Sequence, residues 1–325
     1  MEWTHKEITS KEEWRSYEQK IDCGNLLQSW EYGAAKTSKL WIVRRFVIFD
    51  DNEVVIGLLQ AFEAKIGLGF KAVRLNRGPL VSEGFLSSRE IRSVLEQNLI
   101  REFLKLCKQQ RWVVVFWAPD ATALNSIASI SKRACWRRNQ VAPWESQRVS
   151  LAGSKQVLMA NLNGKWRNGL RKSSRQPFQV RIIETSEDAA TCIAFYEAFA
   201  ESKKFKGLKT SFLKSFWEQA VQEKRIVLFA AFNNESDLIG VVGISLGFDT
   251  ATYLIGCTNL EGRKDNANYS LLWEALLFAR RSGFSYFDVG GLTLNTPTGI
   301  SRFKRGINGR HYSDHGEYIL FPYLI

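Results

Sequence analysis

The residues with the clearest chemical potential lie near the C-terminus. A short apolar stretch, 284–289, carries Asp288 at its end and runs directly into Gly290 and Gly291. Paired glycines let a backbone turn sharply or approach a ligand closely. A carboxylate at a strand end can orient an amine or accept its proton. Asp288 could equally cap the glycine turn, and the residues alone leave both interpretations open.

A cationic segment, Arg-Phe-Lys-Arg-Gly at 302–306, follows the glycines, and we expect it to form a turn. Acyl transfer to an amine needs an aligned acyl ester and stabilisation of a tetrahedral oxyanion. Lys304 could donate to that oxyanion or bind a phosphate of the donor. Phe303 could present its backbone carbonyl to the attacking amine or be an aromatic core residue. A solvated basic turn is the alternative for the whole segment.

Length and charge restrict the class of protein. The chain has 325 residues, which is long for one core, so two domains are expected. Its net charge of +12 predicts an anionic partner: a nucleic acid, a phosphorylated substrate or an acidic membrane surface. We find no signal peptide pattern and no apolar run of membrane-spanning length, and expect a cytoplasmic protein. The five scattered cysteines argue against a disulfide framework or a metal site.

Hydrophobic periodicity predicts the same order of elements in both halves: helix, helix, three strands, helix, strand. In the first half these are 12–20, 26–38, 40–49, 54–63, 71–75, 88–109 and 112–117. In the second half they are 187–202, 210–223, 226–232, 238–246, 252–257, 267–281 and 284–289. The repetition predicts an internal duplication. The fold class is therefore α+β, with a mixed sheet in each half and a helix that crosses over to a parallel strand.

A basic segment separates the halves, and we expect one helix over 154–175. Between 165 and 175 it carries five cations: Lys165, Arg167, Arg171, Lys172 and Arg175. Such a run is commonly a solvated helix face. The functional alternative is a surface that binds a polyanion.

Several segments resemble a known family. The order of elements is similar to that of the GNAT acyltransferase fold, and the motifs resemble the Fem-type (FemABX) aminoacyltransferases. These enzymes attach amino acids from aminoacyl-tRNA to the stem peptide of peptidoglycan precursors. The motifs are Leu27–Lys36, Lys165–Lys172, Tyr253–Gly256, Asn268–Ala275, Phe287–Gly291, Gly299–Gly306 and Gly316–Tyr318.

The resemblance implies two tandem GNAT-like domains, 1–150 on the acceptor side and 151–325 with the basic helix. A last strand near 318–320 would return to the first domain. It implies an aminoacyltransferase with aminoacyl-tRNA as co-substrate, a peptidoglycan precursor as acceptor, no cofactor, and peripheral contact with the inner membrane. The chain departs from the family at Ala118-Pro119, where relatives commonly have Asp-Pro, which leaves the acceptor open. The alternative is an N-acyltransferase that uses acyl-CoA or an acyl carrier protein.

The resemblance also assigns residues to roles. Lys304 is catalytic, with Phe303 and Asp288, and Lys36 matches a lysine that serves the precursor's phosphates. Arg77, at a predicted strand end, is a second candidate for that anion. The motif positions also assign Tyr253, Asn268, Tyr269 and Arg302 to substrate binding. The five cations between 165 and 175 and the net charge predict that Arg167, Arg171 and Arg175 bind tRNA. A CoA pyrophosphate would need a glycine-rich turn before the second crossover helix, and residues 261–268 hold one glycine.

Overall fold

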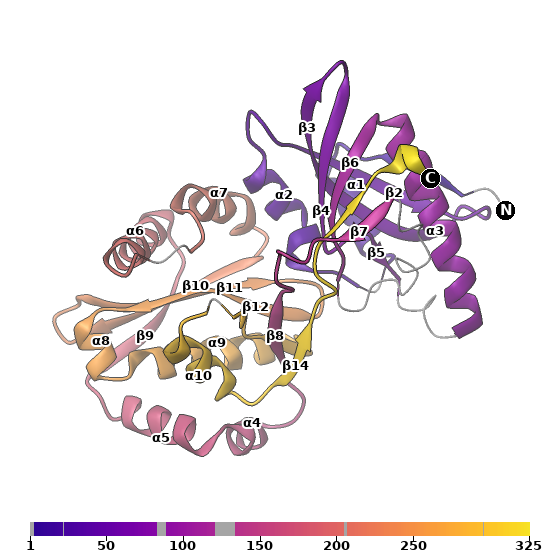
Figure 1. The fold of residues 1–325 in the computed structure, drawn as a ribbon. Coiled ribbons are helices and arrows are strands. Elements are labelled where there is room, and N and C mark those ends of the chain that lie inside the picture. The colour runs from indigo at the N-terminus through magenta and orange to yellow at the C-terminus, as the bar shows by residue number, and fades with distance from the viewer. Residues whose placement is uncertain (1–2, 22, 83–88, 121–133, 205–206, 295) are drawn as a thin grey trace. The chain divides into compact units, whose positions relative to one another are not determined.

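The structure is a computed structural model that describes residues 3–21, 23–82, 89–120, 134–204, 207–294 and 296–325 (Figure 1). The chain forms two compact units: unit 1 is 1–144 with 313–325, and unit 2 is 145–312. The division falls after Trp144 and not at residue 150. The reason is that strand β8 (Glu145–Ser150) pairs with β13 (Tyr286–Asp288) in the sheet of unit 2. Across the described residues no helix is long and apolar enough to cross a membrane.

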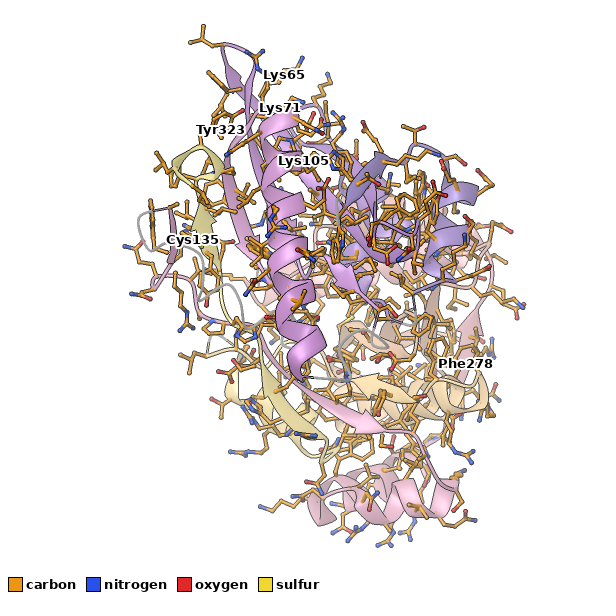
Figure 2. The ribbon with its side chains drawn as sticks, turned by 90° about the vertical axis from the view of Figure 1, so that its right-hand side faces the viewer. Lys65, Lys71, Lys105, Cys135, Phe278 and Tyr323 are labelled. Atoms are coloured by element: carbon orange, nitrogen blue, oxygen red, sulfur yellow. The ribbon has the colours of Figure 1, made fainter. Side chains whose placement is uncertain are left out.

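Unit 1 is a mixed sheet in the order β1-β2-β3-β4-β6-β15-β7, with β5 paired to β3. Crossover helix α3 connects the parallel strands β4 and β6 (Figures 1 and 2). Its strands are β1 (Thr4–Glu7), β2 (Ile42–Phe49), β3 (Val55–Gly67), β4 (Phe70–Asn76), β5 (Leu80–Val81), β6 (Trp112–Ala118), β7 (Cys135–Arg137) and β15 (Tyr318–Leu320). Its helices are α1 (Lys11–Glu18), η1 (Leu26–Gln28), α2 (Trp30–Lys36), α3 (Arg89–Gln109) and η4 (Pro322–Leu324).

Unit 2 has a second mixed sheet in the order β14-β8-β13-β12-β11-β10-β9. Helices α6 and α7 lie on one side of it and α5 and α9 on the other (Figure 1). Its other strands are β9 (Phe178–Ile183), β10 (Ile226–Asn233), β11 (Leu238–Leu246), β12 (Thr250–Thr258) and β14 (Arg310–Ser313). Its helices are α4 (Lys155–Asn161), α5 (Gly164–Ser173), α6 (Ser186–Ser202), α7 (Thr210–Ala220), α8 (Leu260–Lys264), α9 (Ala267–Arg281) and α10 (Thr298–Arg305).

The two sheets share one pattern of pairing. In unit 1, β1 to β4 form an antiparallel series, and β4 pairs in parallel with β6. In unit 2, β9 to β12 form the same series, and β12 pairs in parallel with β13 through crossover helix α9. The next strand differs in origin: β15 comes from the end of the chain, whereas β8 precedes the rest of unit 2. The predicted α+β fold with two mixed sheets and two crossover helices is confirmed.

Two expected helices are each interrupted in the structure. The helix expected over 26–38 is η1 followed by α2, because the Ser29 hydroxyl caps α2 by accepting from the Tyr32 amide at 3.3 Å. The basic helix expected over 154–175 is two helices, α4 and α5, because Asn163 caps α5 and interrupts the run. The expected start of the first crossover helix at Ser88 lies outside the described residues.

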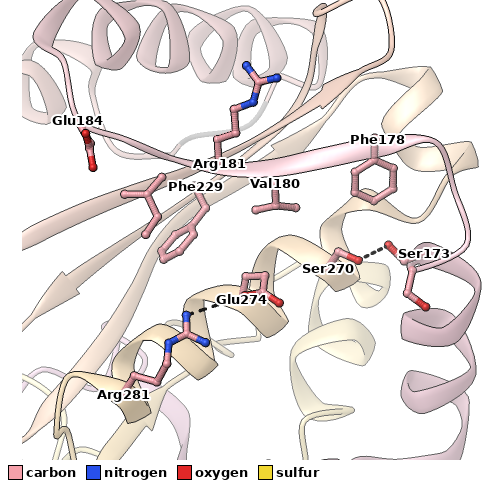
Figure 3. Close-up of a pocket in the computed structure, with 11 residues that line it drawn as sticks. Ser173, Phe178, Val180, Arg181, Glu184, Phe229, Ser270, Glu274 and Arg281 are labelled. Atoms are coloured by element: carbon pink, nitrogen blue, oxygen red, sulfur yellow. Dashed lines mark hydrogen bonds and ion pairs between the residues drawn. The ribbon is translucent and has the colours of Figure 1, made fainter.

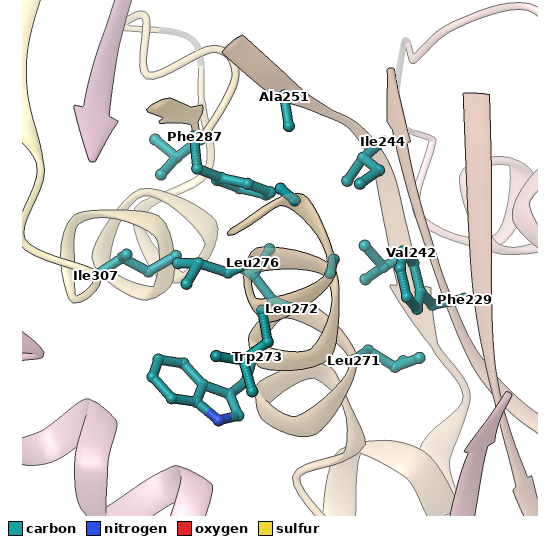
Figure 4. Close-up of a cluster of buried hydrophobic side chains, with 14 of the residues drawn as sticks. Phe229, Val242, Ile244, Ala251, Leu271, Leu272, Trp273, Leu276, Phe287 and Ile307 are labelled. Carbon is teal, nitrogen blue, oxygen red and sulfur yellow. The ribbon is translucent and has the colours of Figure 1, made fainter. Parts of the chain in front are cut away.

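The core of unit 2 supports the end of β13. Leu271, Leu272 and Leu276 lie on one face of α9, fully buried against the sheet (Figure 4). Val242 from β11 and Phe287 from β13 contact the same cluster. Burial of these side chains contributes the main stabilising term for the packing of α9 on the sheet. Because Phe287 is buried here, the neighbouring Asp288 is held at a fixed place at the strand end.

Candidate functional site

The parallel strands of unit 2 separate at the end of β13. Their pairing runs from Thr250 to Thr252 on β12, where the last partner is Asp288, and β12 then continues to Thr258. In unit 1 the corresponding pair, β4 and β6, stays paired to Asn76 and the end of both strands. Of these two parallel pairs, the one in unit 2 loses its pairing before β12 ends, which leaves backbone groups of β12 unpaired with β13 beyond Asp288. The candidate site is therefore in unit 2.

The backbone after β13 is hydrogen-bonded to β8. The amide of Val289 donates to the carbonyl of Gln147 at 3.0 Å, and the amide of Leu292 donates to the carbonyl of Glu145 at 2.7 Å. These two amides therefore bond to β8 and do not continue the parallel pairing with β12. This arrangement explains why the strands diverge at the two glycines.

Asp288 is buried, and both of its carboxylate oxygens accept hydrogen bonds. Oδ1 accepts from the Ser146 hydroxyl at 2.6 Å and from the Gly290 amide at 2.8 Å, and Oδ2 accepts from the Tyr312 hydroxyl at 2.6 Å. Because three donors already bind this carboxylate, its role is to hold the surrounding backbone and side chains in place. Asp288 therefore caps the glycine turn, which is one of the two roles that its sequence allowed.

Ser146 and Tyr312 are functional-site residues that the sequence did not reveal. They lie 142 and 24 residues from Asp288 along the chain. They reach it because β8 pairs with β13 and β14 pairs with β8. Neither belongs to a local motif, so no sequence signal could have identified them.

Gly290 is required by two features of its environment. Its φ is +71°, in the left-handed region that favours glycine. A Cβ atom at this position would also lie 2.7 Å from the carbonyl oxygen of Tyr253. The backbone at Gly290 therefore lies against β12, where a side chain would force the two strands apart.

Lys304 is buried at this point, with 7% of its surface exposed. Its Nζ donates to the Gly291 carbonyl at 3.2 Å and lies 4.7 Å from the centre of the Tyr253 ring. Burial lowers the pKa of Lys304 from 10.5 to about 8, and the charge of Asp288 partly opposes this shift. One carbonyl accepts one of the three ammonium donors, so the group retains capacity to donate to a developing oxyanion.

Lys304 lies in a helix and not in the turn that we expected. Helix α10 begins after Pro297 and ends at Gly306, the residue of its C-cap. The helix is held by an aromatic contact: the Phe303 ring stacks on Trp166 of α5 at 5.8 Å and meets the edge of Tyr269 at 5.1 Å. This packing turns Lys304 toward the interior.

Phe303 and Tyr269 therefore have packing roles in this structure. The Tyr269 ring lies against Gly169, where an added Cβ would come within 2.5 Å of it, so α5 and α9 approach closely. The carbonyl of Phe303, the atom expected to meet the amine, accepts the Gly306 amide at 3.2 Å. Of the other assigned residues in unit 2, Asn268 is half-buried at the start of α9 and Arg302 is exposed on α10.

The cations of the basic segment divide into two kinds. Arg167 donates to the carbonyls of Ala160 and Leu162, both at 2.7 Å, and so closes the end of α4. Arg171 and Arg175 are exposed. The first is therefore a structural contact, while the other two remain available to a partner.

A wider cationic surface surrounds the end of α5. The Ser173 hydroxyl donates to the carbonyl of Asn266 at 2.8 Å, which brings the end of α5 beside the start of α9. Helix α8, with two more exposed cations, ends directly before that point. We call these five exposed residues the cationic surface of unit 2: Arg171, Lys172, Arg175, Arg263 and Lys264.

The two residues of unit 1 that were assigned to the acceptor's phosphates, Lys36 and Arg77, have different surroundings. Lys36 is exposed at the end of α2, with its Nζ 5.7 Å from the centre of the Tyr32 ring. Arg77 is half-buried, pairs with Asp314 at 3.1 Å and lies over the ring of Trp144. Burial raises the pKa of Tyr32 to about 12, against the influence of nearby arginines including Arg77. An anion that binds at Arg77 would compete with the Asp314 carboxylate.

A separate pocket of about 550 Å³ lies between β9 and α9 (Figure 3). Phe178 and Val180 form apolar parts of its wall, and Glu274 pairs with Arg281 at 4.0 Å. None of the residues assigned from the sequence lines this pocket. No group of three or more His, Cys, Asp or Glu that could hold a metal ion occurs within the described part of the chain.

Comparison with known proteins identifies the fold. Residues 160–305 match the family model described as Acetyltransferase (GNAT) domain. The structure is similar to FemX, with a TM-score of 0.80 and 15% identity over 98% of this chain and 97% of that chain. It is also similar to L-PGS from Bacillus licheniformis (TM-score 0.56, 13% identity, 96% and 92% covered). No curated protein matches the sequence.

A further similar structure is a tandem GNAT protein from the clavulanic acid biosynthesis pathway, with a TM-score of 0.54 and 12% identity over 99% of both chains. Together these matches establish two tandem GNAT-like domains. The resemblance to the Fem type is confirmed at the level of the fold by FemX. Unit 2 is an acyltransferase domain of the GNAT type.

Proposed function

We propose that this chain is a cytoplasmic Fem-type aminoacyltransferase that moves an amino acid from aminoacyl-tRNA to an amine of a peptidoglycan precursor stem peptide. The observation that carries the proposal is the buried ammonium of Lys304 beside the diverging strands of unit 2. A charged donor held in a buried place is what a developing oxyanion requires. The fold shared with FemX supports the family assignment.

In the proposed reaction the acceptor amine attacks the ester carbonyl of the donor. A C–N bond forms, the ester C–O bond breaks, and the ribose oxygen of the tRNA leaves with a proton from the amine. Lys304 donates to the carbonyl oxygen while its charge develops. Asp288 acts indirectly, because it fixes the turn whose Gly291 carbonyl orients the Lys304 ammonium.

Two features support tRNA as the donor. Several amides of the segment before α9, where a CoA pyrophosphate would need free donors, are already bonded within the chain. They are those of Gly262, Arg263, Asp265 and Asn266. The cationic surface of unit 2 lies beside the same helix and can neutralise several phosphates. The donor is thus a co-substrate, and the transfer needs no cofactor.

We assign acceptor binding to unit 1. Lys36 is an exposed cation, and Arg77 is a guanidinium already balanced by Asp314. Both suit the phosphates of a wall precursor, and guanidinium groups bind phosphate through paired hydrogen bonds.

An N-acyltransferase that uses acyl-CoA or an acyl carrier protein is the second candidate. It is favoured by the description of the matching family model as an acetyltransferase domain. The two candidates differ in the donor and share the chemistry at Lys304.

The donor is tested by incubating the chain with precursor peptides and, in separate reactions, mixed aminoacyl-tRNA, acyl-CoA or acylated carrier protein. The mass of the acceptor is then measured. The proposal predicts an added amino acid residue only with charged tRNA. A mass increase with acyl-CoA alone would establish the second candidate instead.

A further inference from the structure

The β3–β4 hairpin of unit 1 ends in an exposed apolar tip. Ile66 is 56% exposed and Leu68 is 91% exposed. Leu68 and Gly69 have φ angles of +49° and +75°. Asparagine and glycine favour this conformation in a two-residue hairpin turn, whereas a bulky residue is strained in it. Neither packing nor local conformation explains a leucine at this position.

The tip extends beyond the strands on both sides of it. Ile42 is the first residue of β2 and pairs with Glu63, so the rest of β3 has no partner in β2. Trp112 is the first residue of β6 and pairs with Lys71, so the start of β4 has none in β6. Residues 64–70 therefore form a projecting, convex end of the sheet (Figure 1).

Other exposed apolar side chains gather at this end of the sheet. Strand β2 begins here, and β15 runs antiparallel to β6, which brings the C-terminus to the start of β6. The Tyr323 hydroxyl donates to the carbonyl of Lys108 at the end of α3, at 3.1 Å (Figure 2). The exposed apolar residues near the tip are Leu40, Ile42, Tyr323, Leu324 and Ile325.

Cations accompany these apolar residues. Lys65 is exposed on the hairpin next to Ile66 (Figure 2). The guanidinium of Arg111 lies 5.4 Å from the centre of the Phe70 ring. Lys39 and Lys108 are also exposed at this end, and the Lys108 ammonium donates to the carbonyl oxygen of Ile325 at 3.4 Å. Glu63, the nearest acidic residue of the hairpin, is already paired with Arg44 and Lys71. The end of unit 1 is therefore both apolar and positively charged.

We infer that this end of unit 1 binds the surface of an anionic lipid bilayer, with Leu68 and Ile66 inserted among the lipids. A projecting apolar tip cannot enclose a small ligand, and it gives a second protein no groove. It does fit an interface that accepts isolated apolar side chains and attracts cations. The inference rests on the surface alone and holds whichever donor the enzyme uses.

The inference is tested by co-sedimentation of the full chain with vesicles. We expect binding to vesicles that contain phosphatidylglycerol and much weaker binding to phosphatidylcholine alone. Leu68→Asn should weaken binding roughly tenfold, the loss expected for one inserted leucine. Lys65→Gln should weaken binding to the anionic vesicles roughly fivefold and leave the neutral ones unaffected.

The variants separate membrane binding from a structural role. Asparagine suits the left-handed conformation at position 68, so Leu68→Asn should fold at least as well as the unmodified chain. Leu260→Asn is the matched control, since Leu260 is an equally apolar residue of unit 2 that is 81% exposed. Its vesicle binding should equal that of the unmodified chain. Failure of the unmodified chain to bind anionic vesicles, or full binding by Leu68→Asn, would overturn the inference.

Discussion

Lys304 is a buried cation, and burying its charge lowers the free energy of unfolding. The side chain is 7% exposed, and the pKa falls from 10.5 to about 8. If this side chain only filled space, an apolar residue at position 304 would give at least the same stability. The ammonium is therefore best explained by what it does to a bound substrate.

We expect Lys304→Met to increase the free energy of unfolding at pH 7. The folded pKa lies below the unfolded value, so the bound proton opposes folding below about pH 8. The shift corresponds to a destabilisation of the folded state by at most about 3 kcal/mol. The contacts of the ammonium with Gly291 and Tyr253 offset part of this. The gain should disappear as the pH rises from about 8 to 10.5, because the unmodified chain then releases the proton.

Urea unfolding at pH 7 and pH 10 measures this difference. Arg302→Met, an exposed cation on the same helix, should change the free energy of unfolding by no more than about 0.5 kcal/mol. A clear loss of stability in Lys304→Met at pH 7 would show that the ammonium supports the fold.

The pH dependence of transfer follows from the same pKa. If the protonated form of Lys304 stabilises the oxyanion, turnover at saturating substrates should fall as the pH rises through about 8. Lys304→Arg should retain activity to higher pH, because a guanidinium stays charged. Steady-state rates between pH 6 and 10 provide the measurement. A rate that keeps rising to pH 9.5 in the unmodified enzyme would be inconsistent with this role.

Among the elements, the close approach of the Gly290 backbone to β12 depends on this glycine. An alanine there would place a methyl group 2.7 Å from the Tyr253 carbonyl, at a φ of +71°. We expect Gly290→Ala to cost at least about 2 kcal/mol of stability and to impair transfer.

Gly283→Ala is the matched control for that prediction. Gly283 has a similar φ of +86°, but an added Cβ would meet no atom within 4 Å. This variant should lose only about 1 kcal/mol, from backbone strain alone. Equal losses for the two glycines in urea unfolding would show that the contact with Tyr253 has no effect.

Helix α5 has two faces with different tasks. Trp166, Gly169 and Leu170 are buried and hold α9 and α10, while the cations of its last turn are exposed. The buried face positions Lys304 through the contact between Phe303 and Trp166. The exposed face belongs to the cationic surface of unit 2. One short helix can thus link the proposed donor site to Lys304, the proposed catalytic residue.

Arg171→Gln with Arg175→Gln should weaken binding of tRNA and lower the slope of log affinity against log salt by about one to two. The reason is that fewer counterions are released when fewer phosphates are neutralised. Filter binding between 50 and 300 mM salt would measure it. Arg167→Gln is the comparison: it removes the cap of α4 and should affect stability with little change in slope. An unchanged slope in the double variant would show that these cations lie on a solvated helix face and do not bind tRNA.

For the molecule as a whole, periodicity predicted most of the local elements but not all of the pairing between distant ones. Periodicity placed α9 at its observed bounds and β10 to β12 within two residues of theirs, because each has an apolar pattern of its own. It did not predict β8 beside β13, since that pairing depends on residues far apart in the chain.

The candidate site shows the same limit. The motifs contained Asp288, Gly290, Tyr253 and Lys304, and the structure brings these four together in unit 2. Helix α10 was mistaken for a turn, because Gly299 lies within it and Gly306 follows it, and because its helical state depends on packing against α5. Burial of Lys304, and with it the lowered pKa, could not be inferred before that packing was known.

The most direct test of the proposed mechanism is single-turnover transfer from saturating aminoacyl-tRNA by the unmodified chain and Lys304→Met. The account predicts a rate lower by roughly a hundred- to a thousandfold, the usual loss when one oxyanion donor is removed. Circular dichroism and urea unfolding would confirm that the variant is folded. An unchanged rate at saturating donor with only a weaker apparent affinity would assign Lys304 to phosphate binding. Unchanged rate and affinity would contradict the assignment of the site itself.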